Sequence, residues 1–217
     1  MLTFARVKTY EHHNERFFRF WAPVYDGIEW FVGGFRTKVV SMLDLKPGDK
    51  VLDVACGTGT LALQLEATGA EVTGVDMSPH MLRQAEKKLK RLKAKRNVNL
   101  EFIQHDARYL PFADGTFDAA MISFALHDMP HDIQVGVLGE MSRVVRPSGR
   151  IVVADYRRPT SMFGRWLAHL FISTYETRYY RRFMKTRLED TLDEAGLKIK
   201  DEKRIIIGMG RILEIAN

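Results

Sequence analysis

The stretch VLDVACGTGT, Val51 to Thr60, decides the fold class of this 217-residue chain. An apolar run with one embedded acid, Asp53, leads directly into a turn of small residues that contains Gly57 and Gly59. A buried strand followed by a glycine turn and a helix opens the folds that bind a ligand at the carboxyl end of a parallel sheet. A Gly-x-Gly turn is, by itself, weak evidence for a ligand, because a tight strand-to-helix connection that binds nothing also uses it.

Strand and helix patterns alternate on the C-terminal side of this turn. Short loops between them predict an α/β fold with a doubly wound, Rossmann-like sheet that is mostly parallel. The last two strand patterns, 197–207 and 211–216, are too close in the chain for a parallel crossover, so we expect a C-terminal antiparallel hairpin. The other predicted strands cover 50–54, 71–75, 99–104, 117–123 and 150–155, and the predicted helices cover 60–66, 79–93, 133–145 and 188–194.

We expect a single domain, since 217 residues with 46% hydrophobic content suit one full core. Within it, residues 1–44 are predicted as an N-terminal helical lid and residues 45–156 as the cofactor-binding core. Residues 157–195 are predicted as a helical cap and residues 196–217 as the terminal hairpin. The helical patterns over 12–44 and 160–183 are both rich in aromatic residues.

The composition excludes several classes of protein. The formal net charge of +6 is a small excess for a chain of this length and does not demand a nucleic-acid partner. The single cysteine, Cys56, excludes an internal disulfide and a multi-thiolate metal site, so we expect no metal and a reducing, cytoplasmic location. No apolar run reaches about 18 residues, so no transmembrane helix is predicted.

Three acids at the ends of or inside successive predicted strands indicate the ligand. Asp76 suits the two hydroxyls of a ribose, and Asp106 suits the amino group of an adenine held between Met77 and Ala107. Asp53 lies where a dinucleotide would place its pyrophosphate, and its charge disfavours phosphate while attracting an ammonium group. Although the turn is also tolerable for NAD, these acids favour a ligand with ribose, adenine and a cationic amino-acid tail, which is S-adenosylmethionine.

Four motifs in order, VLDVACGTGT, GVDMS, HDARYLPFADGTFD and LGEMSRVVRPSGRIVVADYRRP, resemble those of class I S-adenosylmethionine-dependent methyltransferases over roughly residues 45–156. Within that superfamily, LPFADGTFD, ISFALHDM, VVRPSGR and the upstream APVYD are most similar to the ubiquinone and menaquinone biosynthesis C-methyltransferases. Residues 157–217 resemble that group only loosely, and Ala55 stands where many members have glycine. The resemblance implies an enzyme that uses S-adenosylmethionine and releases S-adenosylhomocysteine.

The resemblance also implies which residues contact the cofactor. The first motif would line the methionine part, Asp76 the ribose and Asp106 the adenine, while Ser123 would pass beneath the sulfonium. Tyr25, in APVYD, would come from the lid toward the cofactor tail, or would be an ordinary core aromatic. In chain order, the predicted cofactor-binding residues are Tyr25, Asp53, Ala55, Cys56, Gly57, Gly59, Asp76, Met77, Asp106, Ala107 and Ser123.

Methyl transfer needs an aligned acceptor and a site that excludes water, and it needs a general base only where the acceptor must lose a proton. His127 follows the fourth strand and is the candidate base, with Asp128 as a group that would orient it. A loop histidine without a chemical role is the competing interpretation. The predicted substrate contacts are Phe124, His127, Tyr156 and Arg157.

The aromatic lid and cap predict a small, apolar acceptor, resembling a quinone or a lipid, and peripheral contact with a membrane. The basic run KKLKRLKAKR, residues 87–96, is interpreted as a solvated helix face, and RYYRRFMKTR, residues 178–187, as the rim of the cap. The fourth strand lacks the Asn/Asp-Pro-Pro-aromatic string of many base amino methylases, which disfavours methylation of base amino groups but not other RNA chemistry. With the basic run interpreted as a solvated face, a nucleic-acid partner is not expected. An RNA methyltransferase and a non-catalytic adenosyl-ligand-binding protein are the two alternative functions.

Overall fold

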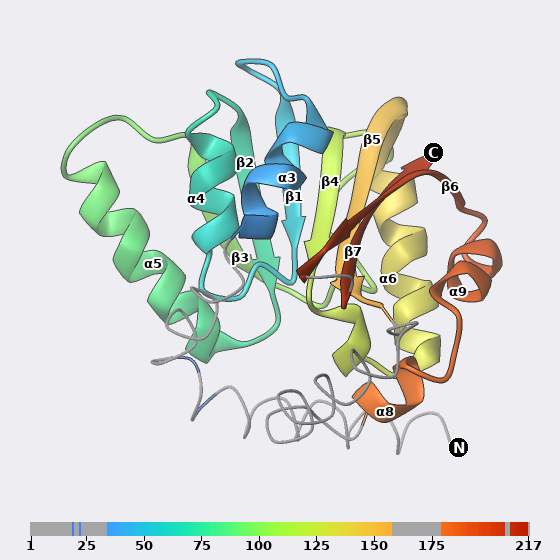
Figure 1. Ribbon diagram of the computed structural model, residues 1–217. Helices are drawn as coiled ribbons and strands as arrows, with labels where there is room; N and C mark the ends of the chain where they lie inside the picture. Colours follow the sequence, from blue (N-terminus) through green and yellow to red (C-terminus); the bar gives the residue numbers. More distant parts are fainter. Residues whose placement is uncertain (1–18, 20–21, 23–33, 158–178, 207–208, 217) are drawn as a thin grey trace.

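The computed structural model describes residues 19, 22, 34–157, 179–206 and 209–216. One seven-stranded sheet with the strand order β3-β2-β1-β4-β5-β7-β6 forms its centre, and helices lie on both faces (Figure 1). The strands are β1 (Lys50–Val54), β2 (Glu71–Asp76), β3 (Leu100–Gln104), β4 (Phe117–Ser123), β5 (Val145–Tyr156), β6 (Lys198–Ile205) and β7 (Gly210–Ala216). The helices are α3 (Gly34–Leu43), α4 (Thr60–Glu66), α5 (Pro79–Lys93), the short η1 (Leu126–Asp128), α6 (His131–Val144), α8 (Tyr180–Phe183) and α9 (Leu188–Glu194).

The sheet is parallel except at its C-terminal strands. β1 pairs in parallel with β2 and β4, β2 with β3, and β4 with β5. β7 runs antiparallel to both of its neighbours, β5 and β6. The predicted doubly wound sheet with a terminal antiparallel hairpin is therefore confirmed. Because the chain winds outward in opposite directions from β1 and from β4, a crevice opens between the carboxyl ends of these two strands.

Alternate side chains along β1 pack into two hydrophobic cores, one on each face of the sheet. Val51 packs on the face covered by α3 and α4, whereas Leu52 and Val54 pack on the face covered by α6. Asp53 therefore belongs to the face of α3 and α4, and only 1% of its surface is exposed. The apolar run of the first motif is thus a strand buried on both sides, as a central parallel strand requires.

Several element boundaries coincide with those predicted. The helices over 60–66 and 188–194 and the strand over 117–123 are found with these limits. The helix α5 begins at Pro79, as predicted, and the Ser78 hydroxyl caps it by accepting a hydrogen bond from the Met81 amide at 3.4 Å.

The strand β5 begins at Val145, five residues earlier than predicted. Its pairing with β4 shifts between Phe117↔Val145 and Ala119↔Arg150, so the Pro-Ser-Gly segment is an irregular part of the strand rather than a separate turn. A Cβ atom on Gly149 would lie 2.6 Å from the Asp118 carbonyl oxygen. This glycine is therefore explained by a close approach of two backbones.

Most of the predicted lid and cap lies outside the described residues. Of the helical pattern over 12–44, the structure describes α3, and of the pattern over 160–183 it describes α8 and Tyr179. Within the described ranges, no helix combines the length and the apolar character needed to cross a bilayer.

Candidate active site

A cavity lies at the carboxyl ends of β1, β2, β3 and β4, with about 980 Å³ of empty space including its open mouth. Its position is the crevice in which doubly wound sheets bind their ligands. Nine of the residues that the sequence predicts for cofactor or substrate line this cavity: Ala55, Cys56, Gly57, Asp76, Met77, Asp106, Ala107, Ser123 and Phe124. Residues as far as 69 positions apart in the chain, Ala55 and Phe124, thus meet in one site, as the fold requires.

The turn after β1 leaves room for a ligand at Gly57. Ala55 and Gly57 adopt left-handed conformations, with φ of 54° and 55°, which explains why glycine suits position 55 in related sequences. A Cβ atom on Gly57 would meet nothing within 4 Å, so its missing side chain faces open space. The backbone is therefore accessible to a ligand at this position.

Gly59 serves packing. It has φ of 73° and does not line the cavity. A Cβ atom there would lie 2.9 Å from Ala85 Cβ and would overlap the ring of Phe102. The close approach of α5 and β3 accounts for this glycine, and its predicted contact with the cofactor stays a prediction.

Asp76, at the end of β2, is fixed by the turn that it faces. Its carboxylate accepts a hydrogen bond from the Gly57 amide at 2.8 Å and another from the Ser78 amide at 2.7 Å. Burial raises the pKa of Asp76 to about 6, against the two backbone hydrogen bonds, which lower it. A carboxylate has about four acceptor positions, so two remain for the hydroxyls of a ribose.

Asp106, after β3, is held by the residue two positions later. Arg108 donates to it from its amide at 2.9 Å and from Nε at 3.0 Å, and its Nη2 forms an ion pair with Oδ2. Burial alone would raise the pKa of Asp106, but the hydrogen bonds and charge of Arg108 outweigh it and hold the pKa below its usual value. Asp106 is therefore an ionised acceptor on the cavity wall, beside Ala107.

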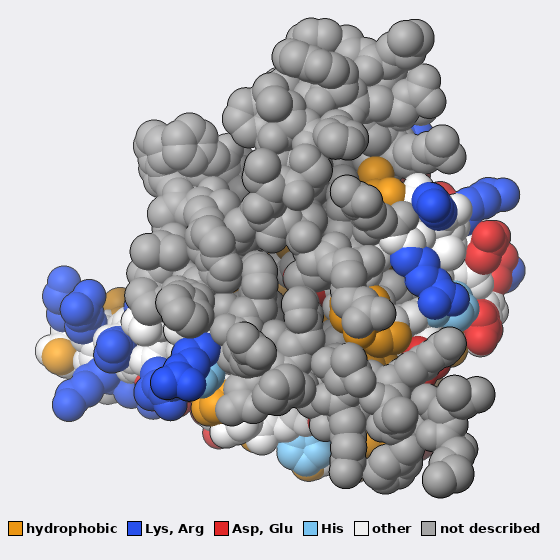
Figure 2. Space-filling model, turned by 90° about the horizontal axis from the view of Figure 1, so that it is seen from below, with side chains coloured by type: hydrophobic (Ala, Val, Ile, Leu, Met, Phe, Trp, Pro, Cys, Tyr) orange, Lys and Arg blue, Asp and Glu red, His pale blue; other side chains and the backbone are white. Residues whose placement is uncertain are grey.

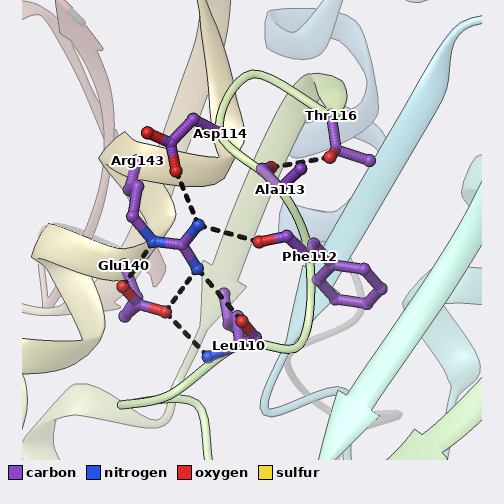
Figure 3. A network of polar contacts seen from close by, with 7 residues as sticks. All are labelled: Leu110, Phe112, Ala113, Asp114, Thr116, Glu140 and Arg143. Carbon is purple, nitrogen blue, oxygen red and sulfur yellow. Dashed lines mark hydrogen bonds and ion pairs between the residues drawn. The ribbon is translucent and has the colours of Figure 1, made fainter.

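The loop that follows Asp106 is anchored to α6 through Arg143 (Figure 3). The guanidinium donates to the carbonyl oxygens of Phe112 at 2.7 Å and Leu110 at 3.0 Å, and pairs with Asp114 and Glu140. Glu140 also accepts the Leu110 amide at 2.7 Å, and Arg143 lowers the pKa of Glu140. This network fixes the loop of the LPFADGTFD motif, whose arginine partner lies about 30 residues away in the sequence.

Cys56 lines the cavity as an uncharged thiol. Burial raises its pKa well above the usual value, and the negative charges of Asp53 and Asp76 raise it further. The side chain is therefore a small neutral group in the turn rather than a nucleophile.

His127 lies behind the cavity wall, in η1. It is 4% exposed, and its Nδ1 lies 2.7 Å from Oδ1 of Asp155, which is itself 1% exposed. The Asp155 carboxylate also accepts the amides of His127 at 3.2 Å and Tyr156 at 2.7 Å. Asp155, rather than the adjacent Asp128, orients the imidazole; Asp128 lines the cavity and lies 3.7 Å from His127 Nε2.

The structure does not bring every predicted substrate residue into the cavity. Tyr156 and Arg157 line a separate depression beside α8 and α9, and Arg157 pairs with Glu202 at 3.3 Å. Asp53 is buried close to the turn but does not line the cavity, and Tyr25 lies outside the described residues.

Several wall residues were not predicted. Apolar side chains of α6 lie at one end, and α3 contributes Phe35 and Arg36 at the other. The apolar positions of α6 follow ordinary core periodicity, so no signal distinguishes a lining residue from a packed one. Within the described ranges, no group of three or more acidic, cysteine or histidine side chains is arranged to hold a metal ion.

Comparison with known proteins agrees with this geometry. A protein-family model described as a methyltransferase domain matches residues 51–149. A demethylmenaquinone methyltransferase of Desulfitobacterium hafniense is 40% identical over 130 residues, which are 58% of this chain and 50% of that protein. An uncharacterized methyltransferase of Synechocystis sp. is 35% identical over 174 residues, which are 77% of each chain. This chain spans about half the length of the demethylmenaquinone methyltransferases that it matches.

Solved structures share the fold at low sequence identity. Magnesium protoporphyrin IX methyltransferase of Synechocystis, with bound S-adenosylhomocysteine, has a TM-score of 0.70 and 19% identity, over 96% of this chain and 99% of that chain. A putative methyltransferase of Haloferax volcanii, in complex with the activator Trm112, has a TM-score of 0.69 and 19% identity, over 92% and 96%. The sequence relatives show that the chain belongs to the class I S-adenosylmethionine-dependent methyltransferases, as a relative of the demethylmenaquinone methyltransferases, and the solved structures show that it shares their fold.

Proposed function

We propose that this chain transfers a methyl group from S-adenosylmethionine to a small, apolar, quinone-like acceptor. The observation that carries the proposal is the convergence of Asp76, Asp106 and the Ala55–Gly57 turn on one cavity. The names of the demethylmenaquinone relatives support a quinone-like acceptor. The aromatic side chains of Phe35 and Phe124, whose ring centroids lie 4.8 Å apart on the cavity wall, support an acceptor of low polarity.

The residues present fit this cofactor. Gly57 exposes its backbone to the cavity, Asp76 keeps acceptor positions for the ribose, and Met77 and Ala107 are apolar surfaces for the adenine. When bound, S-adenosylmethionine supplies an electrophilic methyl group on a positively charged sulfur. The chain then has to hold the acceptor in line and exclude water, which needs no obligatory catalytic side chain.

An acceptor that loses a proton during the transfer needs a nearby base. Among the described residues, Asp128 together with His127 can supply one. Asp128 reaches the cavity, and His127 lies behind it with its imidazole held by Asp155. In this proposal Asp128 faces the acceptor, and His127 stabilises the charge of Asp128. His127 acts as a positioning residue, since it does not line the cavity itself.

The exposure of the basic run, residues 87–96, supports its interpretation as a solvated helix face. Figure 2 shows Lys and Arg side chains gathered over α5, where Lys87, Lys90, Arg91 and Lys93 are exposed. Lys88, from the same run, donates to the hydroxyls of Thr58 at 3.0 Å and Thr60 at 2.8 Å. Peripheral membrane contact stays a prediction, because residues 158–178, which carry most of it, lie outside the described residues.

The test combines binding and transfer. Calorimetry with S-adenosylmethionine, S-adenosylhomocysteine and NADH should show saturable binding of the first two only. Methyl-labelled cofactor with a reduced naphthoquinone lacking the ring methyl should then yield an extractable labelled product, whereas transfer RNA should remain unlabelled. Binding of NADH without either adenosyl ligand would overturn the proposal, and labelled RNA would overturn its choice of acceptor.

A further inference from the structure

The two ends of the cavity lie on opposite faces of the sheet. Met77 and Ala107 pack against the core between the sheet and α6, and Ile133 and Val137 of α6 line the same end. At the other end, Phe35 and Leu61 belong to the core that contains α3 and α4. A ligand with its adenine at the α6 end therefore directs its tail toward α3 and α4.

Asp53 lies on the same face as this second end, by the alternation of side chains along β1. The tail of S-adenosylmethionine carries an ammonium and a carboxylate. Asp53 suits the ammonium, whereas the carboxylate needs a cation or several N–H donors when it leaves water. The turn offers few such donors, because the amides of Cys56, Gly57 and Gly59 donate to Val75, Asp76 and Cys56, respectively.

A cationic side chain is present at this end. Arg36 lines the cavity from α3 although only 7% of its surface is exposed, and its Cζ lies 5.5 Å from the ring centroid of Phe35. Arg108 and His105, which also line the cavity, belong to the loop of Asp106 at the adenine end. Arg36 therefore places a permanent positive charge at the end of the cavity that lies opposite the adenine site.

We propose that Arg36 binds the carboxylate of the cofactor's amino-acid tail. This inference rests on the proposed function. It adds the residue that would make binding depend on the cofactor's amino-acid tail as well as on its adenosine. Arg36 would then contact the carboxylate from the cavity wall, while Asp53, which does not line the cavity, would attract the ammonium through its charge from the same face of the sheet. The planar guanidinium matches a carboxylate with two parallel hydrogen bonds, which a lysine does not reproduce.

The experiment compares two ligands that differ only in this carboxylate. S-adenosylhomocysteine and its decarboxylated analogue, which keeps the adenosine, the thioether and the ammonium, are titrated by calorimetry into the full chain. The wild-type chain should bind S-adenosylhomocysteine at least about tenfold more tightly. Arg36→Gln should lose about tenfold for S-adenosylhomocysteine and change less than about twofold for the analogue, with Arg36→Lys in between.

Arg108→Gln is the matched control at the adenine end and should weaken both ligands by the same factor. Equal binding of the two ligands by the wild-type chain would overturn the inference without any variant, which guards against Arg36→Gln failing to fold. Equal losses for both ligands in Arg36→Gln would also overturn it. A wild-type chain that binds neither ligand would overturn the proposed function, whereas these other outcomes leave that function intact.

Discussion

The adenosine end of the cavity and the wall near His127 are built in different ways. At the adenosine end, the acids are fixed by backbone amides or by near neighbours: Asp76 by Gly57 and Ser78, and Asp106 by Arg108. The wall near His127 depends on Asp155, which is 28 residues away at the end of another strand. The first region is fixed mainly by residues two positions away in the chain, with one further bond from the turn after β1, whereas the second depends on a contact between η1 and β5.

This difference separates what the two regions are suited to do. Groups held by backbone amides and by near neighbours keep one geometry, which serves a ligand that is the same across a family. Groups held across strands change with each packing arrangement, which serves an acceptor that differs between members. The proposal therefore predicts that changes at the adenosine end alter cofactor binding and that changes near His127 alter turnover.

The largest effect is expected for Asp76→Ala. Loss of two charge-assisted hydrogen bonds to the ribose, at about 1.5 kcal/mol each, should weaken binding of S-adenosylhomocysteine by about a hundredfold or more. Calorimetry measures this, with Asp128→Asn as the control that keeps the cofactor affinity. An unchanged dissociation constant in Asp76→Ala would place the ribose elsewhere.

The same contrast explains how far the sequence alone could predict the site. The positions of Asp76 and Asp106 follow from strand ends and known spacing, so a one-dimensional pattern is enough to find them. The packing role of Gly59 could not be predicted, because a glycine that admits Phe102 and one that admits a ligand look identical in sequence. Asp155 was missed as the partner of His127 because the pairing of β4 with β5, in which Ser123 lies opposite Ala154, brings them together.

Arg36 shows a second limit of sequence reasoning. It occurs in a helix that precedes the first motif, and no local pattern marks an arginine there as buried. The fold, by contrast, was predictable almost in full over the described ranges. The alternating apolar runs, Ser78-Pro79 and the short connection between the last two strands each restrict the possible secondary structure and topology. The early start of β5 was missed because Pro147 and Gly149 are ordinarily turn residues, whereas a close backbone approach explains Gly149 here.

The next effect concerns the loop after Asp106. Arg143→Met should lower the free energy of unfolding by about 2 kcal/mol, because it removes bonds to two carbonyl oxygens and leaves Glu140 without its cation. Denaturant titration measures this, and Arg146→Met, which removes a more exposed ion pair with Asp118, should cost less than about 1 kcal/mol. Equal effects of the two substitutions would show that the network does not anchor the loop.

A smaller effect is expected for the His127 pair. His127→Asn and Asp155→Asn should each lower kcat about tenfold while leaving the affinity for S-adenosylhomocysteine unchanged. The double variant should be little worse than either single one, since both changes disable the same group. A loss of cofactor affinity in either variant, or additive losses of kcat, would contradict the separation of the two regions.

The smallest effect is a pH dependence that has opposite signs for binding and for stability. Since the pKa of Asp76 is about 6, lowering the pH from 7.5 to 5.5 removes most of its ionised form, and the affinity for S-adenosylhomocysteine should fall about fourfold. The ligand-free chain should respond the other way. A carboxyl whose folded-state pKa is raised from 3.8 contributes stability that is present below 3.8 and is lost as the pH rises through about 6.

Asp76→Asn removes the titrating group and should abolish both trends, and the variant's affinity should be independent of pH across this window. Thermal unfolding with and without S-adenosylhomocysteine measures both at once, because the stabilisation by the ligand should shrink at pH 5.5 as the ligand-free chain becomes more stable. If the variant keeps the wild-type pH dependence, a group other than Asp76 titrates at the adenosine end. In that case, the two backbone amides would hold Asp76 ionised throughout, and its burial would not govern cofactor binding.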